Sequence, residues 1–390
     1  MTPADQAAIT YLRQPQAIRD RTHQLFDLCQ TDNLDHFGCN LSRLDAVAEY
    51  VIETTQQLYP DFAVPFHSRW RHFGTRLPVA LVPSQEEKNI ALPSFLQGKA
   101  LKEAKAQLDL ATISVLLDAG AGSQWRYQDV ITNQVLGRSE GLAVASLRAF
   151  ERGFFSTDPV TLHQVDAAGL QTLTESDLAQ IFQVNDQNPL VGLSGRLTLI
   201  HQLGDALARQ PERFGSPPRL GNLLDYWLHR YGQTLDAGTL LTEVLESFSS
   251  IWPGRVALGG TNLGDVWPHP ALPNTGPGTN LVPFHKLSQW LTYSLVEPLA
   301  TAGVTVTNLD ALTGLAEYRN GGLCVDMELL VPKHPEVTTK AHSPSSLVVV
   351  EWRALTVIML DLMGERIRQL LNKSAEEFPL IKILEGGTWA

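Results

Sequence analysis

Apolar residues recur at helical spacing through most of the long segments of this chain, and this pattern constrains its fold more than any other feature. Leu44, Val47 and Val51, for example, fall on one face of a helix. Strand signals are confined to short apolar runs such as Val79–Val82 and Val304–Val306, and no segment alternates strands with helices as a parallel α/β sheet requires. The sequence therefore predicts a mainly α, multi-helical fold with a few short strands.

Capping side chains and prolines indicate where several helices begin and end. Ser42 with Asp45, and Thr174 with Asp177, match the spacing of a capping box, in which a hydroxyl and a carboxylate each accept a backbone N–H. Pro15 lacks the N–H that a helix interior uses, so it interrupts the N-terminal helical segment. We therefore expect helices to begin just after Ser42 and Thr174.

The length and composition fit one large globular unit. The chain has 390 residues and a hydrophobic fraction of 44%, enough to bury a sizeable core. It contains no repeat and no clear linker, so residues 1–390 are predicted to form a single helical unit. The proline-rich segment 211–218 is the best candidate boundary. It would separate an N-terminal lobe, 1–210, from a C-terminal lobe, 219–390, that carries the catalytic segment.

Charge and cysteine content exclude several classes of protein. A net charge of −11 argues against a nucleic-acid binder, which needs basic residues to neutralise phosphates. Three cysteines without a CxxC motif argue against a disulfide scaffold. The apolar run Leu347–Met363 carries Glu351, Arg353 and Asp361, which predicts a buried helix rather than a membrane span. We expect a soluble, cytoplasmic protein without membrane contact; its oligomeric state is not indicated.

An ammonium, a carboxylate and a guanidinium come from two largely apolar segments between residues 281 and 326. Pro283 fits the first turn of a helix that carries Lys286, and Glu317 and Arg319 precede a double glycine. Three interpretations stay open: exposed side chains, the default for charged residues, a structural ion pair, or a catalytic site. In a catalytic site, Glu317 is a base or electrostatic stabiliser and Lys286 an acid or an anion contact.

Basic and aromatic side chains also alternate at Arg69, Trp70 and Arg71. Such a cluster can bind a phosphate or stack on a planar ligand. Alternatively, the tryptophan anchors a loop in the core while the arginines are solvated. The remaining candidate ligand contacts are Asp118, Trp125, Arg126 and Asp265.

Glu351 stands in the apolar sequence Val-Val-Val-Glu-Trp-Arg. A carboxylate there needs a partner from another segment, and Arg319 and Arg126 are candidates. We expect Glu351 to support the site rather than to perform chemistry. The histidines do not fall at metal-ligand spacing such as HExxH, so the sequence predicts no metal site.

Five motifs resemble the uracil catabolism protein four family, a former domain of unknown function, and together they span nearly the whole chain. They are Pro-Phe-His-Ser-Arg-Trp-Arg-His-Phe (65–73), Asp-Ala-Gly-Ala-Gly-Ser-Gln-Trp-Arg-Tyr (118–127), Arg-Ser-Glu-Gly-Leu (138–142), Ala-Glu-Tyr-Arg-Asn-Gly-Gly-Leu (316–323) and Leu-Glu-Gly-Gly-Thr-Trp (384–389). The resemblance implies a role in a route that degrades uracil through ribosylurea, in which urea is released from ribosylurea or its 5′-phosphate. It also implies that related chains continue somewhat beyond the last motif.

A weaker resemblance is to the queuosine salvage proteins, helical N-glycosidases related in fold to helix-hairpin-helix DNA glycosylases. The matching segments are 282–289, 312–319 and 351–354, in the same order. The resemblance places Lys286 at the position of the site lysine and Glu317 at that of the site aspartate. Glutamate in place of aspartate shifts the carboxylate oxygens by about one bond, and Asn320-Gly-Gly replaces a Val-Pro segment.

These resemblances imply an N-ribosyl hydrolase that needs no cofactor and binds a small ribosyl substrate, with or without a phosphate. Breaking the C1′–N bond builds oxocarbenium character, which Glu317 would stabilise while Lys286 assists departure of urea. Arg319 and the arginines at 69, 71 and 126 would contact phosphate, and the tryptophans at 70 and 125 would exclude water. Two alternatives remain: amidohydrolase-type cleavage of a ureido compound, and a non-catalytic module that binds a nucleotide-like ligand.

Overall fold

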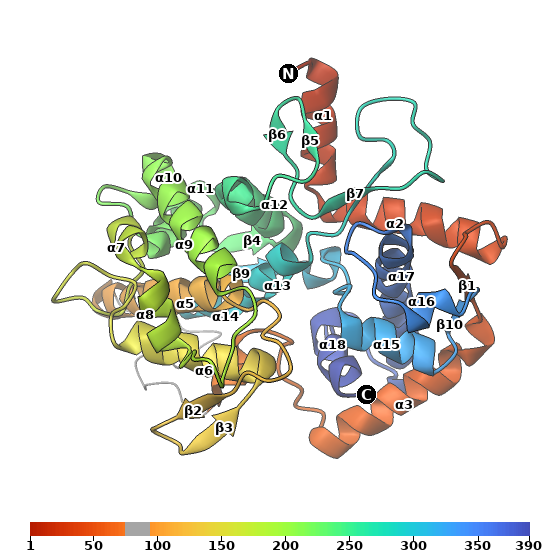
Figure 1. Ribbon diagram of the computed structural model, residues 1–390, viewed down its shortest axis with the longest axis horizontal. Helices are drawn as coiled ribbons and strands as arrows, with labels where there is room; N and C mark the ends of the chain where they lie inside the picture. The colour runs from red at the N-terminus through yellow and green to blue at the C-terminus, as the bar shows by residue number, and fades with distance from the viewer. Residues whose placement is uncertain (75–93) are drawn as a thin grey trace.

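The computed structural model describes residues 1–74 and 94–390, and it is built mainly of helices (Figure 1). This confirms the predicted mainly α fold. The strand predicted at Val79–Val82 lies outside the described residues. The helices are α1 (Pro3–Leu12), α2 (Pro15–Gln30), α3 (Leu44–Leu58), α4 (Trp70–Phe73), α5 (Ser94–Leu116), α6 (Arg138–Glu151), α7 (Ala167–Thr172), α8 (Glu175–Ile181), α9 (Leu193–Ala208), α10 (Pro211–Phe214), α11 (Leu223–Tyr231), α12 (Ala237–Phe248), α13 (Lys286–Ser294), α14 (Val296–Thr301), α15 (Tyr318–Asp326), α16 (Glu336–Thr339), α17 (Leu347–Leu371) and α18 (Leu380–Trp389).

The strands are short and occur in pairs. They are β1 (Phe37–Cys39), β2 (Tyr127–Asp129), β3 (Gln134–Leu136), β4 (Thr234–Asp236), β5 (Ala257–Leu258), β6 (Thr261–Asn262), β7 (Val266–Pro268), β8 (Leu281–Pro283), β9 (Thr305–Thr307) and β10 (Leu330–Pro332). The pairs β1–β10, β2–β3, β5–β6 and β7–β8 are antiparallel, whereas β4 and β9 are parallel. The predicted strand at Val304–Val306 therefore exists, one residue further on.

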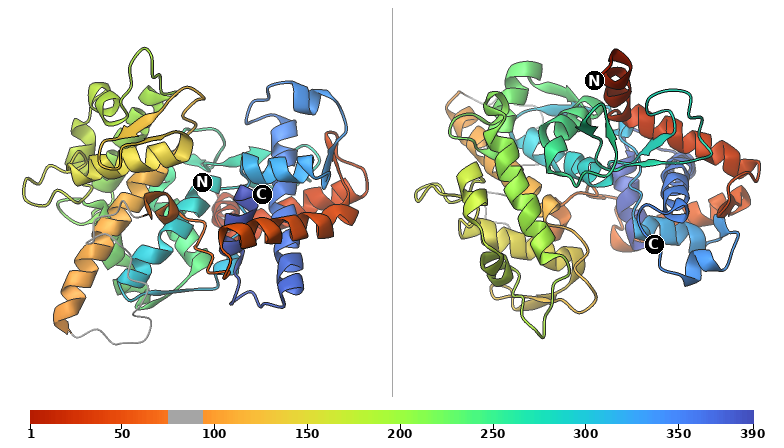
Figure 2. Two further views of the ribbon diagram at one scale, coloured as in Figure 1. Left: turned by 90° about the horizontal axis from the view of Figure 1, so that it is seen from below. Right: turned by 45° about the horizontal axis from the view of Figure 1, so that its top comes forward.

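Helices from the two ends of the chain pack against each other. The long helix α17 contacts α2, α3, α15 and α18, and these elements lie together on one side of the molecule (Figures 1 and 2). Elements α5 to α12 lie on the other side, and α13 and α14 contact α5. One continuous apolar core runs through both groups, from Leu25 and Ile358 to Leu110 and Leu240. The lobe boundary at 211–218, a segment that begins with α10, stays a prediction.

Helix α17 combines a buried apolar surface with paired charges. Its N-cap Ser346 accepts the N–H of Val349, and its C-cap Asn372 adopts a left-handed conformation (φ 51°). On the helix, Asp361 pairs with Arg19 from α2 at 3.0 Å. In residues 1–74 and 94–390, no helix has the length and apolar character needed to cross a bilayer.

Both helices begin just after the predicted residues, but only one of the two predicted capping boxes forms. Thr174 and Asp177 form the expected capping box at the start of α8, and α2 begins at Pro15. The capping box at Ser42 is wrong, because Ser42 lies within a 3-10 turn (Leu41–Arg43) and its hydroxyl donates to Asn40. Helix α3 consequently begins at Leu44 without a side-chain cap.

The adjacent glycines of α15 offer a matched test of packing against α17. A Cβ at Gly321 would lie 2.7 Å from ring atoms of Trp352, whereas a Cβ at Gly322 would meet nothing within 4 Å. Gly321→Ala should therefore lower the free energy of unfolding by about 1–3 kcal/mol through overpacking. Gly322→Ala should raise it by up to about 1 kcal/mol through helix propensity. Guanidinium denaturation measures both, and equal effects of the two substitutions would contradict the packing argument.

Candidate active site

Lys286 is the first residue of α13, and its position depends on the chain just before it. His285 takes a left-handed conformation (φ 47°) as the N-cap. The prediction that Pro283 belongs to the first turn of this helix is wrong, because Pro283 pairs with Val266 at the end of β8. The backbone N–H of Lys286 donates to Asp265 Oδ2 at 3.1 Å. The start of α13 is thus held by a carboxylate from the preceding loop.

Asp265 is itself held by α17. Arg353 donates to both of its oxygens, at 2.8 and 2.6 Å, and the indole of Trp267 donates to Oδ1 at 2.8 Å. Burial alone would raise the pKa of Asp265, but Arg353 outweighs it and keeps the pKa below its ordinary value. Asp265 was predicted as a ligand contact; the structure places it beneath the start of α13, with both oxygens bonded inside the protein.

Glu317, the N-cap of α15, meets Lys286 as the sequence order suggested. Its backbone is extended (φ −108°, ψ 159°), and Oε2 lies 3.7 Å from Lys286 Nζ. The Glu317 side chain is 18% exposed and the Lys286 side chain 29%. The pair is therefore neither sealed in the core nor free on the surface.

The second oxygen of Glu317 has protein partners. Oε1 accepts from Thr388 Oγ1 at 3.0 Å and from Asn320 Nδ2 at 3.3 Å, and it lies 3.6 Å from His67 Nε2. Burial would raise the pKa of Glu317, but His67 and Lys286 outweigh burial and lower it. Glu317 is therefore a carboxylate at neutral pH.

His67 connects Glu317 to a second carboxylate, Glu385. His67 Nδ1 lies 3.0 Å from Glu385 Oε2. The other oxygen of Glu385 accepts from Arg71 at 2.8 Å, Tyr59 at 3.0 Å and Trp389 at 2.8 Å. Burial opposes ionisation of Glu385, but its partners lower the pKa to about 2. Glu385, His67 and Glu317 thus form a continuous chain of contacts.

Sequence reasoning missed most of this chain of contacts. His67 and Glu385 entered only as parts of family motifs, and His67 also in the comparison with metal-ligand spacing. A signal was present, because Glu385, Thr388 and Trp389 are three and four residues apart and so share one face of α18. In the described part of the chain, no group of three or more His, Cys, Asp or Glu side chains is placed to hold a metal ion.

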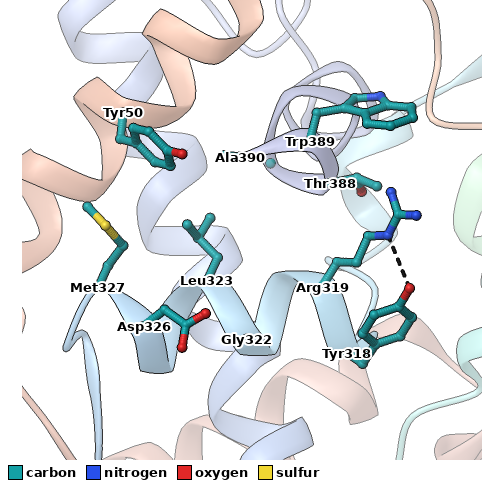
Figure 3. A pocket seen from close by; sticks show the side chains of 11 residues that line it. Tyr50, Tyr318, Arg319, Gly322, Leu323, Asp326, Met327, Thr388, Trp389 and Ala390 are labelled. Carbon is teal, nitrogen blue, oxygen red and sulfur yellow. Dashed lines mark hydrogen bonds between the residues drawn. The ribbon is translucent and has the colours of Figure 1, made fainter.

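Trp389 forms one wall of a pocket at the site, and two arginines lie near its ring. The guanidinium of Arg319 lies 5.3 Å from the centre of its ring and that of Arg71 lies 5.5 Å from it. A pocket of about 540 Å³ opens beside this wall, and Figure 3 shows Arg319, Thr388 and Trp389 at one end of it, with Tyr50 at the other. Arg319 Nε donates to Tyr318 at 3.3 Å.

Trp70 is buried, as the interpretation of a tryptophan that anchors a loop predicts, but Arg69 lies deeper than that interpretation predicts. Arg69 is fully buried and bonds Asp118 at 2.9 Å and Ser114 at 2.7 Å, so the interpretation of solvated arginines is wrong for this residue. The indole of Trp70 donates to the carbonyl of Ser294 at 2.7 Å. Arg69, Trp70 and Asp118 thus join α4 to α5 and to the end of α13.

Three other candidates lie apart from the Glu317–Lys286 pair. Trp125 is fully buried, with its indole bonded to Phe182. Arg126 is exposed and donates to backbone carbonyls of its own loop. Glu351 is buried, but the expected arginine partners are wrong. Its carboxylate instead accepts the backbone N–H of His36 at 3.0 Å and lies 3.6 Å from His269.

Two arginines of α17 give a matched test of how the start of α13 is held. Arg353→Met would leave Asp265 without its cationic partner, which should cost about 3–5 kcal/mol of unfolding free energy. Arg366 makes a more exposed pair with Asp45, whose side chain is 61% exposed, so Arg366→Met should cost at most about 1 kcal/mol.

The stability that the Asp265–Arg353 pair contributes should also depend on pH. Because the folded-state pKa of Asp265 is depressed, its contribution is present at neutral pH and is lost as pH falls through the folded value. Guanidinium denaturation of wild type and both variants at pH 7 and at pH 3, below the ordinary pKa of an aspartate, measures the effect. An Arg353→Met loss no larger than that of Arg366→Met would contradict the assignment.

Comparison with known sequences agrees with the resemblance noted above. The sequence model of the family described as "Protein of unknown function (DUF1688)" matches residues 11–390. The chain is 38% identical over 392 residues to "Protein urg3" of Schizosaccharomyces pombe, covering 96% of this chain and 90% of that protein.

A second relative is "Uracil catabolism protein 4" of Lachancea kluyveri, 34% identical over 421 residues, covering 98% of this chain and 92% of that protein. The resemblance to the uracil catabolism family is thereby confirmed, whereas the likeness to the queuosine salvage proteins stays a prediction. The match over residues 11–390 shows that the chain belongs to the family described as "Protein of unknown function (DUF1688)".

Proposed function

We propose that this protein acts in uracil catabolism as an N-ribosyl hydrolase, which releases urea from ribosylurea or ribosylurea 5′-phosphate. The observation that carries the proposal is the partly exposed Glu317–Lys286 pair, with 3.7 Å between Oε2 and Nζ. The pathway is supported by the relative named "Uracil catabolism protein 4". The reaction is supported by the chemistry that such a pair can perform on a C1′–N bond.

The depressed pKa of Glu317 helps to define its role. A carboxylate whose pKa lies below 4.5 holds a proton weakly, so it is a poor general acid at neutral pH. It remains negatively charged, which stabilises the positive charge that develops at C1′ as the bond to nitrogen lengthens. We therefore assign Glu317 to electrostatic stabilisation of the oxocarbenium-like state and to orientation of the attacking water.

Lys286 is assigned to the departing urea. Its ammonium lies beside Glu317 and 5.5 Å from the centre of the Trp290 ring. It can donate a hydrogen bond or a proton to the urea oxygen or nitrogen as negative charge builds there. Its distance from the carboxylate is longer than a close ion pair, which leaves its N–H groups available to a ligand.

The contacts of the other candidates narrow the substrate-binding set. Arg319 borders the larger pocket and is our choice for a phosphate or ribose contact. Arg71 is partly committed to Glu385, and Arg69 is enclosed by the protein. We assign supporting roles to the remaining predicted contacts, which are Trp70, Asp118, Trp125, Arg126, Asp265 and Glu351.

Two alternatives receive less support. A non-catalytic module would tolerate Glu317 turned to solvent far from Lys286, and the close pair speaks against it. An amidohydrolase would cut within the ureido group and release ammonia, and no observation at the site favours that chemistry. The identity of the products separates it from the proposed hydrolase.

The first test is direct assay of product. Purified protein incubated with ribosylurea, and separately with its 5′-phosphate, should release urea and ribose or ribose 5-phosphate in equal amounts. Ammonia in place of urea would favour the amidohydrolase. If neither compound gives any product, the hydrolase proposal is contradicted.

The second test removes the charge of Glu317 while keeping its shape. Glu317→Gln should lower kcat by about 10²–10³, because a group that stabilises transition-state charge is lost. Because the folded pKa of Glu317 is lowered, the wild-type rate should stay constant from neutral pH down to the ordinary pKa of a glutamate, about 4.3, and fall only at lower pH. Glu175→Gln, at an exposed position on α8, is the control. A folded Glu317→Gln enzyme with full activity would refute the assigned role.

A further inference from the structure

The two oxygens of Glu317 are not equivalent. Oε1 accepts hydrogen bonds from Thr388 at 3.0 Å and from Asn320 at 3.3 Å, and it lies 3.6 Å from His67 Nε2. Oε2 faces Lys286 Nζ, 3.7 Å away. The proposed reaction needs one carboxylate oxygen directed at the substrate. The groups that hold Oε1 therefore decide which oxygen is available.

Thr388 makes the shortest of these contacts to Oε1, and it uses its hydroxyl proton to do so. A hydroxyl has one proton to donate, and a threonine within a helix often donates it to the carbonyl four residues earlier. Thr55, Thr292 and Thr356, all buried on other helices, do this at 2.7–2.8 Å. Thr388, near the end of α18, donates to Glu317 instead. Its hydroxyl therefore joins α18 to the start of α15.

The packing of α18 against α3 brings Thr388 to this position. A Cβ at Gly386 would lie 1.9 Å from Thr55 Oγ1, so a glycine is needed for the two helices to approach this closely. Thr388 is 7% exposed and lines the pocket of about 540 Å³, beside Arg319 and Trp389 (Figure 3). Its hydroxyl is thus held by packing at the edge of the pocket that we propose for the substrate.

We infer that Thr388 is a positioning residue, whose hydroxyl holds Oε1 of Glu317 and leaves Oε2 to face the substrate. The inference rests on the proposed function, in which Glu317 stabilises positive charge at C1′. Thr388 acts through Glu317 and takes no part in the bond changes. A carboxylate that rotates freely would direct an oxygen at C1′ for only part of the time, and small misplacements of such a group lower the rate strongly.

The same hydrogen bond affects the ionisation of Glu317. Burial raises the pKa of Glu317, whereas His67, Lys286 and the Thr388 hydroxyl lower it. Thr388→Val changes no charge, so the pKa of Glu317 should rise in this variant. As pH falls, activity should then be lost at a higher pH than in the wild type. The charged and titratable side chains around Glu317 and its neighbour His67 are those of Arg71, Lys286, Arg319 and Glu385.

The kinetic test compares two substitutions of Thr388. Thr388→Val removes the hydroxyl and keeps the shape, so kcat for urea release should fall about ten- to a hundredfold while KM changes less than about threefold. Thr388→Ser keeps the hydroxyl and should stay within about threefold of the wild-type kcat. In the Glu317→Gln background, Thr388→Val should lower kcat no further, because the two residues act as a unit.

Thr356→Val is the matched control. It also removes a buried helix hydroxyl, but one that bonds the carbonyl of Trp352 on its own helix. It should leave kcat and its pH dependence unchanged. Circular dichroism of each variant checks that it is folded.

A second measurement needs no activity. Carbon-13 NMR of protein labelled at the glutamate carboxyl carbons follows the titration of Glu317, whose signal is the one that Glu317→Gln removes. Its midpoint should rise in Thr388→Val, and it should stay in place in Thr388→Ser and Thr356→Val. Titration of Glu317 is thereby measured whether or not the protein releases urea.

Several results would overturn the inference. These are a wild-type kcat in Thr388→Val, an equal loss in Thr388→Ser, a loss confined to KM, or an unmoved Glu317 midpoint in Thr388→Val. Failure of the proposed function gives a different outcome. A midpoint that depends on the Thr388 hydroxyl, in a protein whose wild type releases no urea, would support the hold on Glu317 and reject the hydrolase. Urea release with a kcat and a midpoint that are insensitive to Thr388→Val would do the reverse.

Discussion

Pairing of buried charge is the constraint on which this structure depends. Arg353 stands on an apolar helix, where an unpaired guanidinium would be costly. Its partner is Asp265, far away in the sequence, at 2.6 and 2.8 Å. The same carboxylate accepts the backbone N–H of Lys286. One ion pair therefore attaches α17 to the loop before α13 and fixes where α13 begins.

The two carboxylates at the site have different surroundings, and this difference separates their roles. Glu385 is 1% exposed, with both oxygens engaged by charged or strongly polar donors. Glu317 has Oε1 engaged, but the contact of Oε2 with Lys286 is 3.7 Å long and joins two partly exposed side chains. A ligand can approach Glu317 without breaking a short hydrogen bond, whereas at Glu385 it would have to displace several. Glu385 contacts His67, whereas Glu317 keeps one oxygen available for the substrate that we propose.

Sequence periodicity predicted the helical fold because helix formation here is mostly a local property. The proline at position 15 and the Thr174 capping box are likewise local signals. Pro283 was wrongly predicted to begin a helix, because its position in β8 depends on a tertiary contact, its pairing with Val266 of β7. Within the site, the Lys286–Glu317 pair was foreseen from the order of motifs. The contact of His67 with Glu385 spans 318 residues, and neither residue has a local pattern that marks a partner so far away.

The charges around Trp389 suggest how a substrate would be oriented. The larger pocket presents Arg319 at its Trp389 end (Figure 3). A smaller pocket of about 210 Å³, which Trp389 also lines, carries two carboxylates, Glu140 and Glu385, and one arginine, Arg71. A molecule with an anionic end and a neutral ureido end would be driven to one orientation, because the reverse would set the anion against Glu140 and Glu385. Glu317 lies next to the larger pocket, because its Oε1 accepts from Thr388, which lines that pocket. The charges of the two pockets would then set the orientation of the substrate, just as the Asp265–Arg353 pair sets the position of the backbone at the start of α13.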